Sequence, residues 1–157
     1  MKSKRSATKK LDRKARGKKR EEPGSTTAKR VFIVEDHPVF RETLVRVLSC
    51  EKDLTVCGEA SNANRAFKAV GRATPDLVLV DITLPGKSGL ELVKELRAVD
   101  RKIKLLVVSM HDAALYAARA VKAGGNGYLR KQGDPEELIH AIRDVLDGRI
   151  YVSEDGD

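Results

Sequence analysis

Short apolar runs alternate with longer amphipathic stretches along residues 30–150, and this alternation is the strongest constraint on the fold. The runs lie at 31–34, 54–57, 77–80, 103–108 and 127–130. Each is followed by a stretch whose apolar residues recur with a helical period, so that a strand–helix unit repeats about every 23 residues. Strands that alternate with helices predict a parallel sheet covered by helices on both faces.

Chain length selects among the folds of this kind. An eight-fold barrel needs about 200 residues or more, and the chain has 157. We therefore predict an α/β fold of flavodoxin-like type, in which five strand–helix units form a doubly wound, five-stranded parallel sheet. Ligands of such sheets bind outside the carboxyl ends of the strands, at the point where the strand order reverses.

The helices are expected near 38–50, 62–73, 88–98, 112–123 and 135–148. Asp134 before Pro135 is a strong signal for the start of the last helix, and Gly124-Gly125 closes the fourth. The residues expected to face the sheet from the first, second, third and fifth helices are Phe40, Leu44, Val47, Leu48, Ala63, Ala66, Phe67, Val70, Leu90, Val93, either Leu92 or Leu96, Leu138, Ile142 and Val145.

Polar side chains that can bind ligands or take part in a reaction lie at the ends of four of the five runs. Glu35 and Asp36 follow the first, Asp81 closes the third, Ser109 the fourth, and Lys131 the fifth. Because the carboxyl ends of parallel strands meet at one edge of a sheet, we expect these side chains to lie together. Each one alone has an ordinary explanation, as a surface residue or a helix-entry acid, but their joint occurrence at strand ends favours a site.

This set of side chains suits the transfer of a phosphoryl group to a carboxylate. Two anions must approach each other, and Mg²⁺ overcomes their repulsion by bridging oxygens of both. Glu35 and Asp36 provide an acidic pocket for the ion, Lys131 a fixed positive charge and Ser109 a hydroxyl donor. Positioning and charge neutralisation are most of what such a transfer requires.

Residues 30–150 resemble the receiver domain of response regulators in two-component signalling. The motifs that carry the resemblance are VEDHP at 34–38, VDITLPG at 80–86, VSMH at 108–111 and GYLRK at 127–131. The separations of 28 residues from Asp81 to Ser109 and 22 from Ser109 to Lys131 also suit this family. The motifs DHP at 36–38 and GRIYVS at 148–153 are most similar to the NarL/FixJ subgroup.

The resemblance implies a role for each matching position. Asp81 would be the phosphoacceptor and a Mg²⁺ ligand, Asp36 would bind Mg²⁺ directly, and Glu35 would act mainly through water. The backbone carbonyl of Thr83 would be a further ligand.

The resemblance also implies a switch and a set of partners. Ser109 would swing toward the phosphoryl group and Tyr128 would change rotamer with it, unless Tyr128 is simply a half-buried strand residue. The phosphoryl donor would be a histidine kinase or a phosphotransfer protein, and the output partner is unknown. The protein would thus be a signalling module and not an enzyme. The Ala-rich stretch at 112–123 would support homodimerisation on phosphorylation, or simply favour the helix.

The charge of the chain is divided between a tail and a domain. Residues 1–30 carry 13 Lys/Arg against 3 Asp/Glu, whereas residues 31–157 carry 18 against 20. We predict a disordered basic tail at 1–28, a receiver domain at 29–150 and a short C-terminal tail at 151–157. The eleven Lys/Arg of residues 1–20 allow nucleic-acid binding through counterion release. A solubilising tail is the alternative.

Two further alternatives concern function. NarL/FixJ regulators usually continue into a helix-turn-helix domain, and no recognition helix can be placed after residue 153. We therefore expect a receiver without that domain, either stand-alone or shortened from a transcription regulator. A haloacid-dehalogenase-like hydrolase would also use an aspartate nucleophile, but it needs a second Asp two positions after Asp81, where Thr83 stands.

Localisation follows from what the sequence contains. Cys50 and Cys57 have no metal-ligand spacing and no secretory signal precedes them, which favours reduced thiols and a cytoplasmic protein. No window approaches about 18 consecutive apolar residues, so we expect no membrane span.

Overall fold

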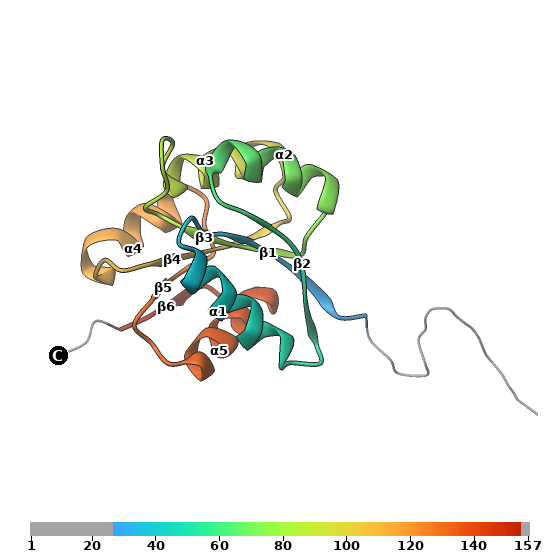
Figure 1. Cartoon of the computed structure of the whole chain (residues 1–157). Helices are drawn as coiled ribbons and strands as arrows, with labels where there is room; N and C mark the ends of the chain where they lie inside the picture. Colours follow the sequence, from blue (N-terminus) through green and yellow to red (C-terminus); the bar gives the residue numbers. More distant parts are fainter. Residues whose placement is uncertain (1–26, 155–157) are drawn as a thin grey trace, which may run out of the picture.

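A computed structural model of the chain describes residues 27–154. Its strands are β1 (Lys29–Val34), β2 (Leu54–Ala60), β3 (Leu77–Asp81), β4 (Lys104–Ser109), β5 (Gly127–Arg130) and β6 (Tyr151–Val152). Its helices are α1 (Pro38–Ser49), α2 (Ala63–Ala73), α3 (Gly89–Val99), α4 (Ala113–Lys122) and α5 (Pro135–Leu146). All strand pairs are parallel and the order is β2-β1-β3-β4-β5-β6 (Figure 1). The flavodoxin-like, doubly wound prediction is confirmed.

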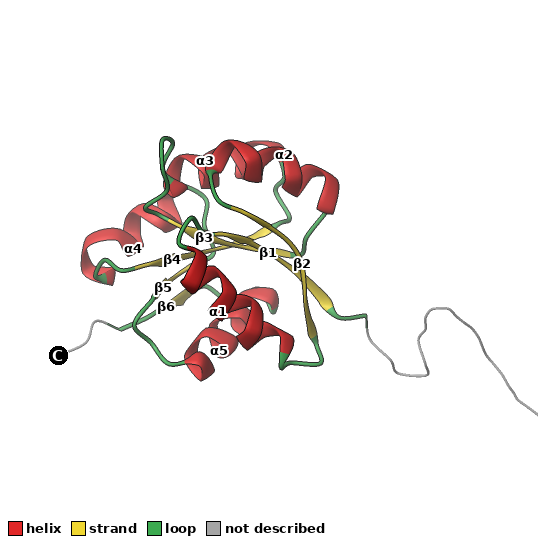
Figure 2. Ribbon diagram, viewed as in Figure 1, coloured by secondary structure: helices red, strands yellow, loops and turns green. Residues whose placement is uncertain are grey.

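Helices cover the sheet on both faces (Figure 2). Side chains of α2, α3 and α4 pack on one face with Phe32 and Val34, and those of α1 and α5 pack on the other with Val31 and Ile33. Successive residues of a strand point to opposite faces, and in β1 both faces meet apolar side chains. This double burial explains why the runs that precede the site are almost uninterrupted in their apolar character.

The order of the strands positions the site. The strand order reverses at β1, which pairs with β2 on one side and β3 on the other. Val34 lies opposite Val80 in the β1–β3 register. The residues that follow them, Glu35 and Asp81, therefore come out side by side at the carboxyl edge, where ligands of this fold bind.

The sheet has one strand more than the five that the sequence predicts. Tyr151 and Val152, which we expected in the C-terminal tail, form β6 on the outer edge of β5. The following Ser153 is buried. Its N–H donates to the Tyr128 carbonyl (2.9 Å), and its hydroxyl accepts from the Arg130 N–H (3.1 Å). A two-residue strand leaves no periodic signal, and it covers an edge that would otherwise be unpaired.

Most residues expected in the core are buried. Leu92 and Leu96 both lie in it, although the sequence favoured only one of them. Phe67 is exposed, at 37%, and Phe40, Val47 and Leu90 are only partly buried. The basic tail predicted at 1–28 lies outside the described residues, except for its last two. Among the described helices, none has the length and apolarity needed to cross a membrane.

Candidate functional site

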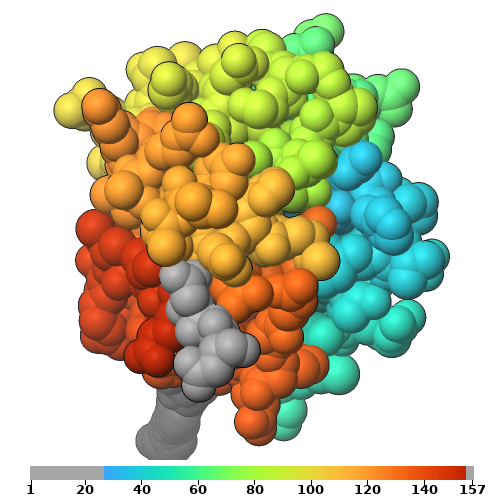
Figure 3. All heavy atoms as spheres, turned by 90° about the vertical axis from the view of Figure 1, so that its left-hand side faces the viewer, coloured from blue at the N-terminus to red at the C-terminus, as the bar shows by residue number. Residues whose placement is uncertain are grey.

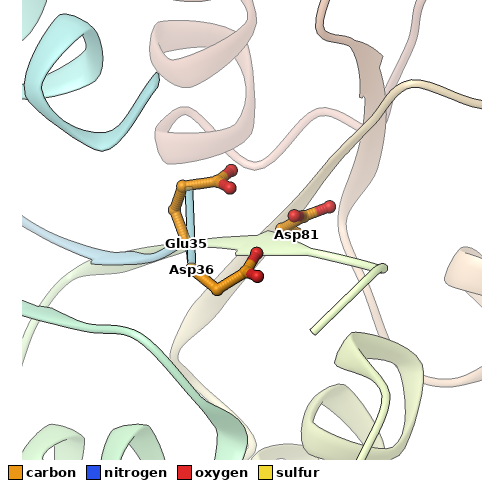
Figure 4. A group of neighbouring side chains, drawn as sticks. All are labelled: Glu35, Asp36 and Asp81. Carbon is orange, nitrogen blue, oxygen red and sulfur yellow. The ribbon is translucent and has the colours of Figure 1, made fainter. Parts of the chain in front are cut away.

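Three carboxylates gather where β1 and β3 end. Oxygen atoms of Glu35, Asp36 and Asp81 lie within 4.8 Å of one another, and Figure 4 shows the three side chains projecting from the ends of the two neighbouring strands. Glu35 and Asp81 are buried, whereas Asp36 is exposed. The cluster is therefore a pocket with one open side rather than a solvated acidic surface.

Lys131 supplies the positive charge at this cluster. Its ammonium lies 2.9 Å from Oε1 of Glu35 and 3.1 Å from Oδ2 of Asp81. Its backbone N–H donates to the Ser109 carbonyl (2.8 Å), which fixes the end of β5 against β4. The ammonium also lies 4.7 Å from the centre of the Phe40 ring, within the range of a cation–π contact.

The pKa values of Glu35 and Lys131 reflect the burial and pairing of the two groups. Desolvation raises the pKa of Glu35, and the charge of Asp81 adds to the effect, whereas the hydrogen bond from Lys131 opposes it. Desolvation alone would lower the pKa of Lys131, but the hydrogen bond to Glu35 and the charge of Asp81 outweigh it and raise that pKa. Lys131 thus keeps its charge inside the pocket.

Backbone groups orient the carboxylates. The Thr83 N–H donates to Oδ1 of Asp81 (3.1 Å), and the His37 N–H donates to Oε2 of Glu35 (3.0 Å). The guanidinium of Arg41 donates to the Glu35 carbonyl (2.7 Å). Each buried acid is thereby held by a backbone donor on one oxygen and by Lys131 on the other.

Ser109 ends β4, next to Val108, which pairs with Asp81 of β3. Its side chain is fully buried and its hydroxyl accepts from the His111 N–H (3.0 Å). Tyr128 is also fully buried, and its hydroxyl donates to the His111 carbonyl (2.6 Å). Desolvation raises the pKa of Tyr128, and hydrogen bonding to Ser109 opposes that rise. The two hydroxyls thus meet at one residue of the β4–α4 loop.

The donor set fits Mg²⁺. This ion prefers octahedral oxygen coordination with one or two carboxylates and several waters. Asp36 offers an exposed carboxylate, and Glu35 and Asp81 offer buried ones within 4.8 Å of it. Figure 3 looks onto this end of the molecule, where the segments after β1 (blue), β3 (lime), β4 (gold) and β5 (orange) adjoin.

Three residues of the site were not identified from the sequence. Phe40 was expected only as a core residue, and Arg41 was not singled out. Gly89 is the third, because a Cβ there would lie 2.0 Å from the Asp81 carbonyl oxygen. The only sequence signal for Gly89 is its place after Ser88, which caps α3 through the Glu91 N–H.

The comparisons with known proteins agree with this geometry. The response regulator receiver domain family matches residues 31–143. The chain is 38% identical over 125 residues to the transcriptional regulatory protein DesR of Bacillus subtilis, covering 79% of this chain and 62% of DesR. It is 33% identical over 124 residues to the nitrate/nitrite response regulator protein NarL of Escherichia coli, covering 79% of this chain and 57% of NarL.

A solved structure is similar as well. The crystal structure of a LuxR-family two-component response regulator from an Aurantimonas species superposes with a TM-score of 0.77 at 36% identity, over 80% of this chain and 89% of that one. The chain spans between about half and three-fifths of the length of the curated relatives it matches. On the motifs, the fold and these matches, the chain belongs to the response regulator receiver domain family.

Proposed function

We propose that the protein accepts a phosphoryl group on Asp81 from a histidine kinase or a phosphotransfer protein and passes the signal to an output partner. The observation that carries this proposal is the contact of one ammonium, that of Lys131, with both buried acids of a three-carboxylate pocket. A structural ion pair needs one carboxylate. An extra pair of acids around it suits a site that receives both a cation and an anion.

The residues divide the work of the transfer. An oxygen of Asp81 forms the new bond to phosphorus as the bond to the donor's leaving group breaks. The Thr83 N–H and the Lys131 ammonium fix the Asp81 carboxylate, and Lys131 then stabilises the negative charge of the phosphoryl oxygens. Mg²⁺ would neutralise the repulsion between the two anions, held by Asp36, Asp81 and the Thr83 carbonyl, with Glu35 acting mainly through water.

The switch in this proposal is the pair Ser109 and Tyr128. Both hydroxyls bond to the backbone of His111, one to its N–H and the other to its carbonyl. A Ser109 hydroxyl that turns to donate to phosphoryl oxygens gives up the His111 N–H, and the β4–α4 loop then loses one of its two fixed points. That loop thus connects a local charge event to the surface around α4.

The partners and the location of the protein are part of the proposal. DesR and NarL are regulators longer than the matched region. The alternative to a protein output partner is therefore a transcriptional output. It would act through a further domain or through nucleic-acid binding by residues 1–20. Residues 1–20 lie outside the described part of the chain. We place the protein in the cytoplasm, with homodimerisation on phosphorylation through the face around α4.

The test is the intact mass of the purified chain after incubation with Mg²⁺ and acetyl phosphate. We expect one phosphate-sized adduct in the wild type and in Asp147→Asn, an exposed control at the end of α5. We expect none in Asp81→Asn or in the presence of a chelator. A folded wild-type chain without an adduct would show a receiver that does not use this chemistry.

A further inference from the structure

A row of cations lies on the outward face of α2. Arg65, Lys68 and Arg72 are three and four positions apart, which places them on one side of the helix. All three side chains are exposed, and α2 contains no acidic residue. Within residues 27–154, no carboxylate forms an ion pair with any of them. The acids of the described part of the chain therefore do not offset their charges.

These cations line a groove between α2 and the end of β2. The groove has a volume of about 460 Å³, and the three helix cations line it together with Arg41 and Glu59. Its one acid, Glu59, is paired with Arg41 at 3.3 Å. The groove consequently keeps the net charge of the three helix cations.

The row continues toward the basic N-terminal region. Arg72 is followed by Ala73, whose carbonyl at the end of α2 accepts a hydrogen bond from the Arg30 guanidinium (2.7 Å). Arg30 and its neighbour Lys29 begin β1 and are exposed. The segment that leads into them contains eleven Lys/Arg in its first twenty residues. The first two residues of β1, Lys29 and Arg30, thus bring further positive charge close to the end of α2.

We propose that this groove, defined by Arg65, Lys68 and Arg72, binds the phosphodiester backbone of a nucleic acid. The helix rises about 1.5 Å per residue, so the three charges form a row that suits a linear polyanion better than a single compact anion. Lys and Arg that neutralise phosphates release condensed counterions, which drives binding without base recognition. The proposal goes beyond receiver chemistry, because the groove cations are separate from the acidic pocket.

The apolar face of α2 argues against a membrane as the ligand. Helices that bind bilayer surfaces insert a free apolar face beneath their basic face. In α2 that face is buried in the core, with Ala63, Ala66 and Val70 at 5% exposure or less. Phe67, which is partly exposed, lines a different hollow with Leu96 and Val99 of α3. The attraction available to this groove is electrostatic.

The test compares two triple variants of the full chain by fluorescence anisotropy with a labelled 20-base-pair DNA over a series of KCl concentrations. The first is Arg65→Gln/Lys68→Gln/Arg72→Gln. The matched control is Lys94→Gln/Lys102→Gln/Lys122→Gln, which removes three exposed charges elsewhere. Because both keep residues 1–26, the contribution of the basic N-terminal region is the same in each.

The slope of log K against log[KCl] is negative, and we expect the groove variant to reduce its magnitude by about 2 to 3. This is close to one unit for each phosphate that the variant no longer neutralises. The control variant should keep the wild-type slope. Equal slopes and affinities for the two variants would overturn the proposal. Polyglutamate that competes as well as unlabelled DNA at equal charge would also overturn it, in favour of an acidic protein. So would groove-dependent binding to phosphatidylglycerol vesicles without binding to DNA.

Discussion

The ammonium of Lys131 lies 3.1 Å from Oδ2 of Asp81, although β4 separates the strands that carry the two residues. It also lies 2.9 Å from Oε1 of Glu35, one strand further away. Lys131 therefore reaches across the carboxyl edge of the sheet and places its single positive charge beside two buried acids. The stability of the acidic cluster and the chemistry that we propose for it are therefore expected to depend on the same side chain.

Replacement of Lys131 by Met is expected to destabilise the protein in the absence of divalent cations. Met keeps the length of the side chain and its packing against Phe40, but it leaves two buried carboxylates without a counter-charge. Removal of one partner of a buried ion pair costs about 3–5 kcal/mol. The measurement is urea unfolding in EDTA.

Mg²⁺ should offset part of this loss, because it brings positive charge to the same acids. We expect a larger rise in Tm on addition of Mg²⁺ for Lys131→Met than for the wild type. Lys122→Met removes an exposed lysine from α4 and is the control, with wild-type behaviour in both buffers. An equal Mg²⁺ effect in all three proteins would contradict a shared site for the ion and the ammonium.

The substitution Asp36→Asn should separate metal binding from stability. Asp36 is exposed, and its carboxylate is within 4.8 Å of those of Glu35 and Asp81. Loss of its charge relieves like-charge repulsion and should stabilise the metal-free protein by up to about 1 kcal/mol. The rise in Tm with Mg²⁺ should disappear. Glu42→Gln, on the exposed side of α1, should preserve the Mg²⁺ response, and a preserved response in Asp36→Asn would exclude Asp36 as a ligand.

Replacement by Ala at two glycines, Gly89 and Gly71, is expected to change the stability of the protein in opposite directions. A Cβ at Gly89 would lie 2.0 Å from the Asp81 carbonyl oxygen, so that Gly89→Ala must move the loop after β3. We expect a destabilisation of about 1–3 kcal/mol, together with slower formation of the phosphate adduct. Gly71, on the exposed side of α2, has open space around its Cβ position.

Gly71→Ala should therefore stabilise the protein by about 0.5–1 kcal/mol, since Ala is the better helix former. Unfolding free energies and adduct rates of both variants test the pair. A neutral Gly89→Ala would mean that the approach of α3 to Asp81 is not a constraint on the site.

A pH-dependent contribution is expected where α5 meets the α1–β2 loop. The hydrogen bond from Arg143 holds the pKa of Asp53 below its ordinary value of 3.8, with Arg143 Nη2 at 2.8 Å from Oδ1. Because the folded state favours the ionised carboxylate, its contribution is present above pH 3.8 and is lost as the pH falls through the lower folded pKa. Asp53 is about half exposed, which limits the contribution to at most about 1 kcal/mol.

Asp53→Asn should accordingly reduce the free energy of unfolding at pH 7, and the difference from wild type should vanish in strong acid. The matched control is the same substitution in an Arg143→Gln background, where it should have no effect at any pH. Urea unfolding between pH 2.5 and 7 measures both. A difference that persists at the acid end would assign the loss to packing instead of charge.

Local sequence by itself determined much of the site. Asp81 closes one apolar run and Lys131 follows another. The alternating pattern implies a parallel sheet, and that sheet predicts that the two side chains meet. The period of the helices and the Asp134-Pro135 start signal placed the helix bounds to within a few residues. These features depend on neighbours in the chain and on the geometry of one sheet, so a single sequence contains them.

Other features depend on contacts between distant segments, and only the tertiary structure decided them. The buried positions of Ser109 and Tyr128, and their common partner His111, follow from how the β4–α4 loop packs over β5. The tight fit at Gly89 follows from the approach of α3 to β3. β6 exists because β5 offers an open edge. No local pattern encodes such contacts, since each depends on which backbone passes nearby once both faces of the sheet are covered.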